Sequence, residues 1–163
     1  MTGDASEHQL CIVDIRECPE HLESLAGWHQ EEWAYLSPDK TLAQRISALS
    51  KHLETSFVPT TLVALGDSGP LGSASIIAHD MDTRPELSPW LACVFVAPAF
   101  RRKGIGSALV TEIVGRAAGQ HLNKLYLFTP DQRTFYERLG WEILEDVAYR
   151  GTNVDIMEID LRV

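Results

Sequence analysis

The feature that most constrains this chain is an apolar strand that runs into a short loop of cations and glycines and then directly into a helix. The strand covers residues 90–96, the loop reads Arg-Arg-Lys-Gly-Ile-Gly from Arg101 to Gly106, and the helix is predicted to continue to about residue 119. Backbone N–H groups at a helix start are unpaired and carry the positive end of the helix dipole. Glycines let an anion approach these groups closely. The stretch therefore predicts a cradle for a phosphate-bearing ligand.

Two common phosphate-binding motifs fit this stretch poorly. A P-loop requires Gly-x-x-x-x-Gly-Lys-Ser/Thr, which the sequence lacks. A dinucleotide fingerprint would place a third glycine three residues after Gly106, where Leu109 stands, and it usually belongs to the first strand–helix unit of a chain. Neither a P-loop nucleotide nor a dinucleotide is therefore favoured as the ligand.

The remaining periodicity predicts an α/β (α+β) fold built on one mixed sheet. The order of elements is β-α-α-β-β-β-α-β-α-β-β. The predicted strands cover residues 9–16, 60–65, 71–79, 90–96, 124–129, 141–149 and 154–161, and the predicted helices cover residues 19–33, 41–53, 104–119 and 132–139. The strand–helix–strand unit of residues 90–129 implies a right-handed parallel crossover, whereas the other neighbouring strands are expected to be antiparallel.

Local signals support several of these boundaries. Thr41, with Gln44 three residues later, resembles a capping box at a helix start. The turn residues 66–70 predict a hairpin between the strands on either side, and Gly140 suits the C-terminal end of a helix. At 163 residues, the chain 1–163 is expected to form a single domain, with residues 1–8 disordered.

Composition excludes several classes of protein. A net charge of −9, from 14 cations and 23 anions, disfavours nucleic acid as a partner because a phosphate backbone requires a basic surface. No apolar run reaches the 18 residues typical of a membrane span, so no membrane association is predicted. The polar, acidic N-terminus lacks the features of a secretory signal, so the predicted location is cytoplasmic.

The cysteines predict neither a disulfide framework nor a metal site. There are three, Cys11, Cys18 and Cys93, and their spacing matches no metal-ligand pattern. Cys11 and Cys93 lie in apolar, strand-like runs, so we expect them to be buried small hydrophobic residues.

The central stretch resembles the Gcn5-related N-acetyltransferase (GNAT) family. The family signature, Arg/Gln-x-x-Gly-x-Gly/Ala at the start of its central helix, is similar to Arg101–Gly106. The preceding Val94–Pro98 resembles the family's fourth strand and its exit, and Phe135–Trp141 resembles the family's Tyr-x-x-x-Gly-Phe segment. The order of elements also matches along nearly all of the chain.

This resemblance implies acetyl-CoA as a cosubstrate, no metal, and a fold whose fourth and fifth strands splay apart around the acyl group. Backbone amides of the loop would hold the pyrophosphate, and the main chain of the fourth strand would pair with the pantetheine arm. The residues that it assigns to acetyl-CoA are Val94, Phe95, Val96, Arg101, Arg102, Lys103, Gly104, Ile105, Gly106, Ser107 and Asp131. Asp131 or Gln132 replaces an asparagine that often follows the fifth strand in relatives.

The family transfers an acetyl group directly to an amine, and Tyr136 matches its thiolate-protonating tyrosine. A phenol with a pKa of about 10 can protonate a thiolate whose conjugate acid has a pKa of about 8.5. Phe135 and Leu139 share a helical face through their i,i+4 spacing. Tyr136 lies about 100° around the helix from Phe135, so it is free to point away from that face. The resemblance therefore assigns Tyr136 the role of catalytic acid.

The general base and the acceptor site stay open at this point. Some relatives carry a carboxylate where this chain has Trp90 or Phe128. A water chain or one of several loop and helix residues could accept the amine proton; these are Glu31, Glu32, His79, Asp80, Asp82 and Glu86. The segments that form the acceptor walls in the family hold Trp28, Trp33, Tyr35, Met81, Trp90, Tyr149 and Arg150.

The sequence thus predicts an acetyl-CoA-dependent N-acetyltransferase that acts on a primary amine of a small molecule or peptide. The alternative is a non-catalytic acyl-CoA-binding regulatory module that kept the cradle and lost turnover. The predicted partners are acetyl-CoA or CoA and an amine acceptor. A homodimer is a further expectation, because relatives are often dimers.

Overall fold

A computed structural model describes residues 10–162, in which one seven-stranded sheet has the order β1-β2-β3-β4-β5-β7-β6. The strands are β1 (Cys11–Asp14), β2 (Thr60–Gly66), β3 (Gly69–Ile77), β4 (Trp90–Val96), β5 (Lys124–Thr129), β6 (Glu142–Tyr149) and β7 (Thr152–Asp160). The α-helices are α1 (Leu22–Trp33), α2 (Leu42–Ser50), α3 (Ile105–Gly119) and α4 (Arg133–Arg138). The 3-10 helices are η2 (Ile15–Glu17), η3 (Pro19–His21), η4 (Lys51–Leu53) and η5 (Pro98–Phe100). The predicted disorder of residues 1–8 falls outside the described residues.

The predicted fold class and order of elements are confirmed. Only β4 and β5 pair in parallel, and the other neighbouring strands pair antiparallel. The predicted capping box is present, because the Thr41 hydroxyl accepts from the Gln44 N–H and the Gln44 side chain accepts from the Thr41 N–H. The first strand is shorter than predicted, because the Asp14 side chain accepts from the Arg16 N–H and starts a 3-10 turn.

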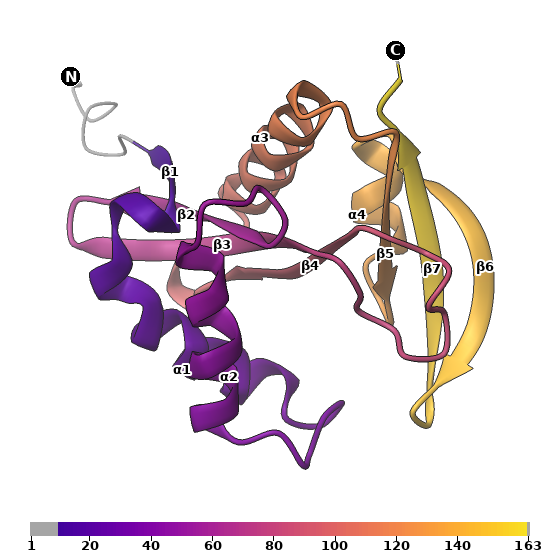
Figure 1. Cartoon of the computed structure of the whole chain (residues 1–163), viewed down its shortest axis with the longest axis horizontal. Helices are drawn as coiled ribbons and strands as arrows, with labels where there is room; N and C mark the ends of the chain where they lie inside the picture. Colours follow the sequence, from indigo (N-terminus) through magenta and orange to yellow (C-terminus); the bar gives the residue numbers. More distant parts are fainter. Residues whose placement is uncertain (1–9, 163) are drawn as a thin grey trace.

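The sheet is covered on both faces, and the alternation of strand side chains explains how (Figure 1). In β2, Leu62 and Ala64 belong to the core cluster with α3 and α4, whereas Val63 belongs to the cluster with α1 and α2. Successive strand residues point to opposite faces, so an apolar run with no polar residue fits a strand covered on both sides. In β5, Leu125 packs with α3, and Tyr126 packs with Trp90 on the opposite face.

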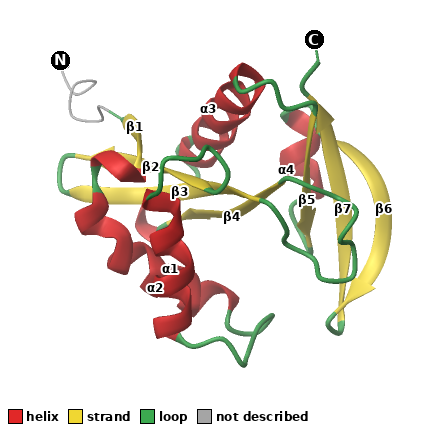
Figure 2. Ribbon diagram, in the orientation of Figure 1, coloured by secondary structure: helices red, strands yellow, loops and turns green. Residues whose placement is uncertain are grey.

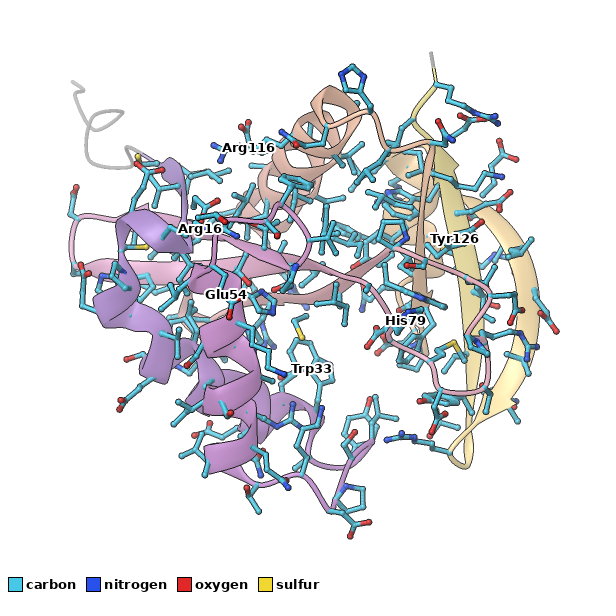
Figure 3. The ribbon with its side chains drawn as sticks, in the orientation of Figure 1. Arg16, Trp33, Glu54, His79, Arg116 and Tyr126 are labelled. Atoms are coloured by element: carbon cyan, nitrogen blue, oxygen red, sulfur yellow. The ribbon has the colours of Figure 1, made fainter. Side chains whose placement is uncertain are left out.

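The segment that follows α2 is anchored to β1 by Arg16. The Arg16 guanidinium donates to the backbone carbonyl of Glu54 and lies 2.8 Å from the Asp14 carboxylate. Figure 3 shows Arg16 and Glu54 next to each other beside α2. These contacts fix the C-terminal end of α2, which forms part of the cleft described below.

The predicted divergence of β4 and β5 is the main break in the sheet (Figure 2). The two strands share one register pair, Trp90 with Tyr126, at the start of β4. Beyond Trp90 the strands separate, so the second half of β4 has no hydrogen-bonding neighbour on its β5 side. An unpaired strand edge inside a fold needs another partner for its backbone groups. The gap is therefore a natural place for an extended ligand.

A bulge in β4 lies at this divergence. Cys93 and Val94 stand opposite the single residue Ala74, because Ser73 pairs with Phe95 and Ser75 pairs with Ala92. Cys93 has a φ of 55°, in the left-handed region that residues other than glycine rarely adopt. A bulge leaves its extra residue unpaired and bends the strand. The backbone of β4 is thereby redirected where the two strands part.

The cysteine expectations hold in part. Cys18 is buried and Cys93 is partly buried, but Cys11 is exposed, so the prediction for Cys11 is wrong. The reason is topological, because β1 forms the edge of the sheet and lacks a neighbouring strand on one side.

Candidate functional site

A cleft of about 730 Å³ opens where β4 and β5 diverge. Its walls come from α1, α2, the start of α3, the β5–α4 connection and the turn between β6 and β7. Ten of the eleven residues predicted to bind acetyl-CoA line it, and these are Val94, Phe95, Val96, Arg101, Arg102, Gly104, Ile105, Gly106, Ser107 and Asp131. Lys103 is exposed and does not line the cleft. One cleft therefore brings together nearly all of the predicted donor site.

The loop before α3 presents a run of free backbone N–H groups. Within the described residues, no backbone oxygen accepts a hydrogen bond from the N–H groups of residues 102–107. Arg102 and Gly104 have positive φ values, 66° and 82°, and Gly104 is the N-cap of α3. The left-handed conformation at Gly104 would strain any residue with a side chain. This geometry offers an anion several donors at the positive end of a helix.

Arg101 is held by protein groups and does not extend freely from the loop. Its Nε donates to the Val96 carbonyl at 2.7 Å, and its guanidinium lies 5.5 Å from the centroid of the Phe95 ring. Its Nη2 is 3.5 Å from a Glu32 carboxylate oxygen, and Glu32 belongs to α1. Arg101 therefore ties the loop to β4 and to α1, whereas Arg102 and Lys103 are exposed and unpaired by any carboxylate of the described chain.

Tyr136 lines the cleft and also belongs to the core cluster. Its side chain is 8% exposed and packs between Phe135 and Trp141, at ring-centroid distances of 4.9 and 6.1 Å. The helical-face argument separated Tyr136 from the core, and in this respect it is wrong, because α4 is one short helix whose most buried residue is Tyr136. Burial, with a smaller contribution from Asp131, raises the pKa of Tyr136, so the phenol keeps its proton at neutral pH.

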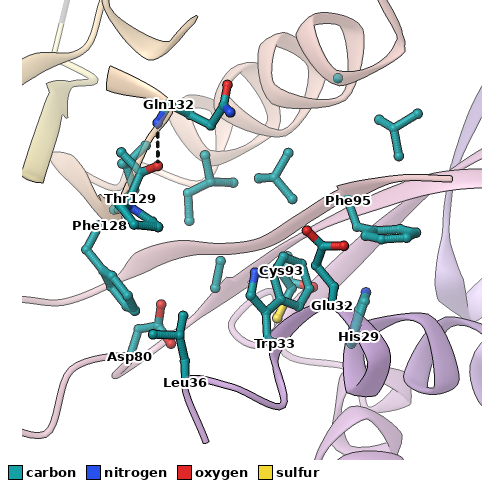
Figure 4. Close-up of a pocket in the computed structure, with 18 of the residues that line it drawn as sticks. His29, Glu32, Trp33, Leu36, Asp80, Cys93, Phe95, Phe128, Thr129 and Gln132 are labelled. Atoms are coloured by element: carbon teal, nitrogen blue, oxygen red, sulfur yellow. Dashed lines mark hydrogen bonds between the residues drawn. The ribbon is translucent and has the colours of Figure 1, made fainter. Parts of the chain in front are cut away.

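The connection between β5 and α4 faces the same space. The Gln132 N–H donates to the Thr129 hydroxyl at 3.0 Å, a bond drawn in Figure 4. Asp131 and Gln132, the two residues considered as a replacement for the missing asparagine, both line the cleft.

At the other end of the cleft, Asp80 differs from the other candidate bases because it lines the cleft and has no ion-pair partner in the described chain. Of the six candidates, only Asp80 and Glu32 line the cleft, and Glu32 already pairs with Arg101. Burial raises the pKa of Asp80 to about 6, and the nearby charges of Lys40 and Arg150 partly oppose this shift. Figure 4 shows Asp80 near Leu36 and Phe128, away from Phe95. The carboxylate is thus ionised at neutral pH and more basic than an exposed aspartate.

Four of the seven residues predicted for the acceptor walls line the cleft. Trp33, Tyr35, Tyr149 and Arg150 line the cleft, whereas Trp28, Met81 and Trp90 do not. Met81 and Trp90 are 1% and 0% exposed and pack together in the core beside β6 and β7. The Trp90 Nε1–H donates to the Leu87 carbonyl at 2.7 Å. Trp90 is therefore a satisfied core residue and not a wall of the site.

A buried polar layer beneath the cleft was not predicted. His29 contacts the Ser73 hydroxyl at 3.1 Å, His52 contacts the Thr61 hydroxyl at 2.8 Å, and Thr61 contacts Ser75 at 2.7 Å. Burial lowers the pKa of His29 to about 4, so this imidazole is neutral at pH 7. The signal in the sequence was the pair of serines at alternate positions of β3, Ser73 and Ser75, together with Thr61 at the start of the otherwise apolar β2.

Two further cationic residues line the cleft that the sequence did not predict to be there. Lys40 and Arg45 come from the start of α2 and the residues before it, and both line the cleft. Helical periodicity assigns the apolar face of α2 to Ile46 and Leu49. The same periodicity predicts that Arg45 lies on the solvent-exposed face. Its neighbour α1 brings it into the cleft wall, through a hydrogen bond from the Arg45 Nε to the Gln30 side chain.

Residues 10–162 contain neither a membrane-spanning helix nor a cluster of metal ligands. In this part of the chain, no helix is long and apolar enough to cross a membrane. The same residues contain no group of three or more histidine, cysteine or acidic side chains placed to hold a metal ion.

Comparisons with known proteins agree with this geometry. The model of the acetyltransferase (GNAT) domain family matches residues 59–143. A comparison with curated proteins found no matching sequence.

Many solved structures share the fold. An N-acetyltransferase from Staphylococcus aureus Mu50 has a TM-score of 0.76 at 13% identity, covering 94% of this chain and 99% of that chain. An aminoglycoside 6'-N-acetyltransferase complexed with coenzyme A has a TM-score of 0.75 at 14% identity, covering 94% and 98%. A GNAT-family acetyltransferase from Streptococcus pneumoniae has a TM-score of 0.69 at 19% identity, covering 93% and 99%.

At such identities the solved structures establish the fold alone, whereas the family model covers just over half of the chain and includes the whole donor loop. The splayed strands, the unpaired amides before α3 and the matching family model lead to one conclusion: this chain belongs to the GNAT acetyltransferase family.

Proposed function

We propose that the protein is an acetyl-CoA-dependent N-acetyltransferase that moves an acetyl group directly to a primary amine. The observation that carries this proposal is that one cleft joins the free amides of residues 102–107 to the Asp80 carboxylate. Tyr136 and the divergence of β4 from β5 lie along the same cleft. The donor, the acid and the base of an acyl transfer can therefore all meet in one space.

In this proposal the donor binds mainly through the backbone. The amides of residues 102–107 take the pyrophosphate, and the exposed Arg102 adds a positive charge beside it. The unpaired edge of β4 from Val94 to Val96 pairs with the amide groups of the pantetheine arm, as a further strand would. Because the Val96 carbonyl already accepts from Arg101, the other polar groups of this edge carry most of that pairing.

The chemistry places a different group at each step. Asp80, directly or through a water, removes a proton from the ammonium so that the amine lone pair can attack the thioester carbon. A backbone N–H of the β4 bulge at Cys93 or Val94 stabilises the oxyanion of the tetrahedral intermediate. The intermediate then collapses with cleavage of the C–S bond. Tyr136 gives its proton to the departing thiolate, and the second proton of the amine passes, directly or through water, to the phenolate and restores the phenol.

A panel assay tests this proposal. Purified protein is mixed with acetyl-CoA and amines of different classes, and release of the free thiol is followed together with the mass of the acetylated product. We expect thiol release that depends on one class of amine, and acetyl-CoA binding in calorimetry well below millimolar concentration. Binding of acetyl-CoA without turnover of any amine would favour the non-catalytic acyl-CoA-binding module. Failure to bind CoA compounds would contradict both functions.

The cytoplasmic location and the homodimer stay predictions. Gel filtration with light scattering of the full chain would decide the oligomeric state.

A further inference from the structure

Arg45 is an unusual residue of the cleft wall because its guanidinium lacks a counter-charge. No carboxylate of the described residues lies within 4.0 Å of it, although most other arginines have one. Its Nη2 is buried and has no hydrogen-bond acceptor in the described chain. Its one side-chain hydrogen bond runs from Nε to the Gln30 side chain. The outer edge of the guanidinium fork, formed by the two Nη atoms, is therefore unused.

Two other arginines of the described chain also lack a carboxylate partner, and both differ from Arg45 in exposure. Arg102 and Arg138 are exposed, so water solvates their charges. Arg45 is only partly exposed, and burial lowers its pKa. A partly desolvated charge without a partner is costly to a folded protein. Such a group needs a physical explanation, and in a cleft wall a ligand that supplies the missing partner is one such explanation.

The neighbouring charges leave Lys40 and Arg45 as the cations of the acceptor end that lack a carboxylate partner in the described chain, and of these two only Arg45 is partly buried. Arg150 pairs with Asp82 at 3.3 Å, and Arg101 pairs with Glu32 at 3.5 Å. Lys40 is exposed at the same cleft. Besides Asp80, which we assign to the amine, the carboxylates that line the cleft are Glu32, which pairs with Arg101, and Asp131 on the β5–α4 connection.

Arg45 and Asp80 act on the same part of β4. The electrostatic influence of both reaches the Cys93 thiol, where Asp80 raises the pKa and Arg45 lowers it, although burial is the main cause of the raised pKa. Cys93 lies at the bulge where β4 diverges from β5. Asp80 and Arg45, which both line the cleft, therefore both lie near Cys93.

We propose that the acceptor of this protein carries an oxyanion, a carboxylate or a phosphate, in addition to its amine, and that Arg45 binds that oxyanion. The proposal rests on the function proposed above. A guanidinium group donates charge-assisted hydrogen bonds to both kinds of oxyanion. With the amine at Asp80 and the oxyanion at Arg45, a zwitterionic acceptor leaves neither buried charge unpaired. A polycation such as an aminoglycoside would have no group for Arg45 and would be repelled by Lys40.

The test compares acceptors that differ only in the oxyanion. Amino acids with acidic, basic, aliphatic and aromatic side chains are each measured against their carboxamides, and O-phosphoethanolamine is measured against ethanolamine. We expect the best oxyanion-bearing acceptor to exceed its neutral counterpart in kcat/KM by about 10- to 100-fold, the range of a hydrogen bond to a charged group. The amino acid pairs test a carboxylate and the phosphoethanolamine pair tests a phosphate, so the pair with the larger ratio identifies which oxyanion the protein binds.

The variant Arg45→Gln should remove this preference and act mainly on KM for the acceptor, with little change in KM for acetyl-CoA. Arg138→Gln, an exposed arginine on α4, is the matched control and should keep the preference. Equal loss with both members of an acceptor pair would show that Arg45 only supports the packing of α2 on α1, and would overturn the proposal. If Arg45→Gln does not fold, Arg45→Met is measured in its place, and an unchanged preference for the oxyanion in that variant overturns the role of Arg45.

A binding experiment separates this proposal from the proposed function. Calorimetry on the CoA-saturated protein measures the same acceptor pairs without chemistry. Tighter binding of the oxyanion-bearing member that disappears in Arg45→Gln supports the site even where no amine is acetylated. If amines that carry an oxyanion and their neutral counterparts are acetylated at equal rates, the oxyanion site at Arg45 is overturned, whereas the proposed N-acetyltransferase function stands. No difference in binding or rate within any pair likewise overturns it.

Discussion

The two ends of the cleft are built in different ways. In the proposed function the donor end is one continuous segment, residues 101–107, which binds mainly through backbone amides and a helix start. The acceptor end combines side chains from α1, α2, the loop after β3 and the β6–β7 turn. The family model covers residues 59–143, so it includes the donor loop and Asp80 but neither α1 nor α2. Recognition through backbone groups needs a local conformation, whereas recognition through side chains needs segments that only the fold brings together.

The largest expected effect tests the chemistry between the two ends. Tyr136→Phe should lower kcat by about 100- to 10,000-fold, because the thiolate loses its proton donor, while the affinity for acetyl-CoA changes little. Steady-state kinetics and calorimetry measure the two quantities. Tyr126→Phe, a tyrosine outside the cleft, serves as the control. An unchanged kcat across the pH range would remove Tyr136 from the mechanism.

The next effect tests the acceptor end. Because burial raises the pKa of Asp80 to about 6, the wild-type kcat/KM should fall as the pH drops through 6, where the carboxylate takes up a proton. Asp80→Asn should lower kcat by about 100-fold and abolish this acid limb. Asp82→Asn, which alters an exposed carboxylate paired with Arg150, should retain the limb. If kcat/KM of Asp80→Asn still fell as the pH dropped through 6, the general base would be another group.

A smaller effect should be confined to the donor end. Gly104→Ala places a side chain at a φ of 82°, which costs about 1–2 kcal/mol in the left-handed conformation. We expect KM for acetyl-CoA to rise several-fold, with KM for the amine unchanged. Gly115→Ala, within α3 and with open space around its added methyl, is the control and should stabilise the helix slightly. Equal effects on both KM values would show that the two ends are not independent.

The smallest effect should appear in stability. Thr41→Ala removes the N-cap of α2, the helix that carries Arg45, and should lower the free energy of unfolding by about 1 kcal/mol. Urea denaturation measures this change. Thr111→Ala, at an exposed position inside α3, should not destabilise the protein. If the Thr41 variant also weakens acceptor binding and leaves donor binding intact, the acceptor end depends on the placement of α2 as the structure indicates.

What the sequence determined by itself was local in origin. Strand and helix periodicity, the Thr41 capping box and the glycine spacing of the loop before α3 each depend on neighbours within a few residues, so the fold and the free backbone amides of this loop could be predicted. These patterns contain no information on which distant side chains share a surface. Six residues could therefore serve as the base on the sequence alone, and burial in the cleft distinguishes Asp80 from the other five.

Only the tertiary structure decided the rest. The left-handed conformation at Cys93 has no signal in the sequence, because a cysteine shows no preference for it; pairing of β4 with β3 imposes the bulge. The sequence does not distinguish Trp90 from a residue of the acceptor walls. The structure does, because the Trp90 indole N–H donates to the Leu87 carbonyl within the core. Arg45 reads as a surface residue of an amphipathic helix until α1 partly buries it. Local conformation follows from the chain, but the solvation and the partners of a charge are properties of the assembled fold.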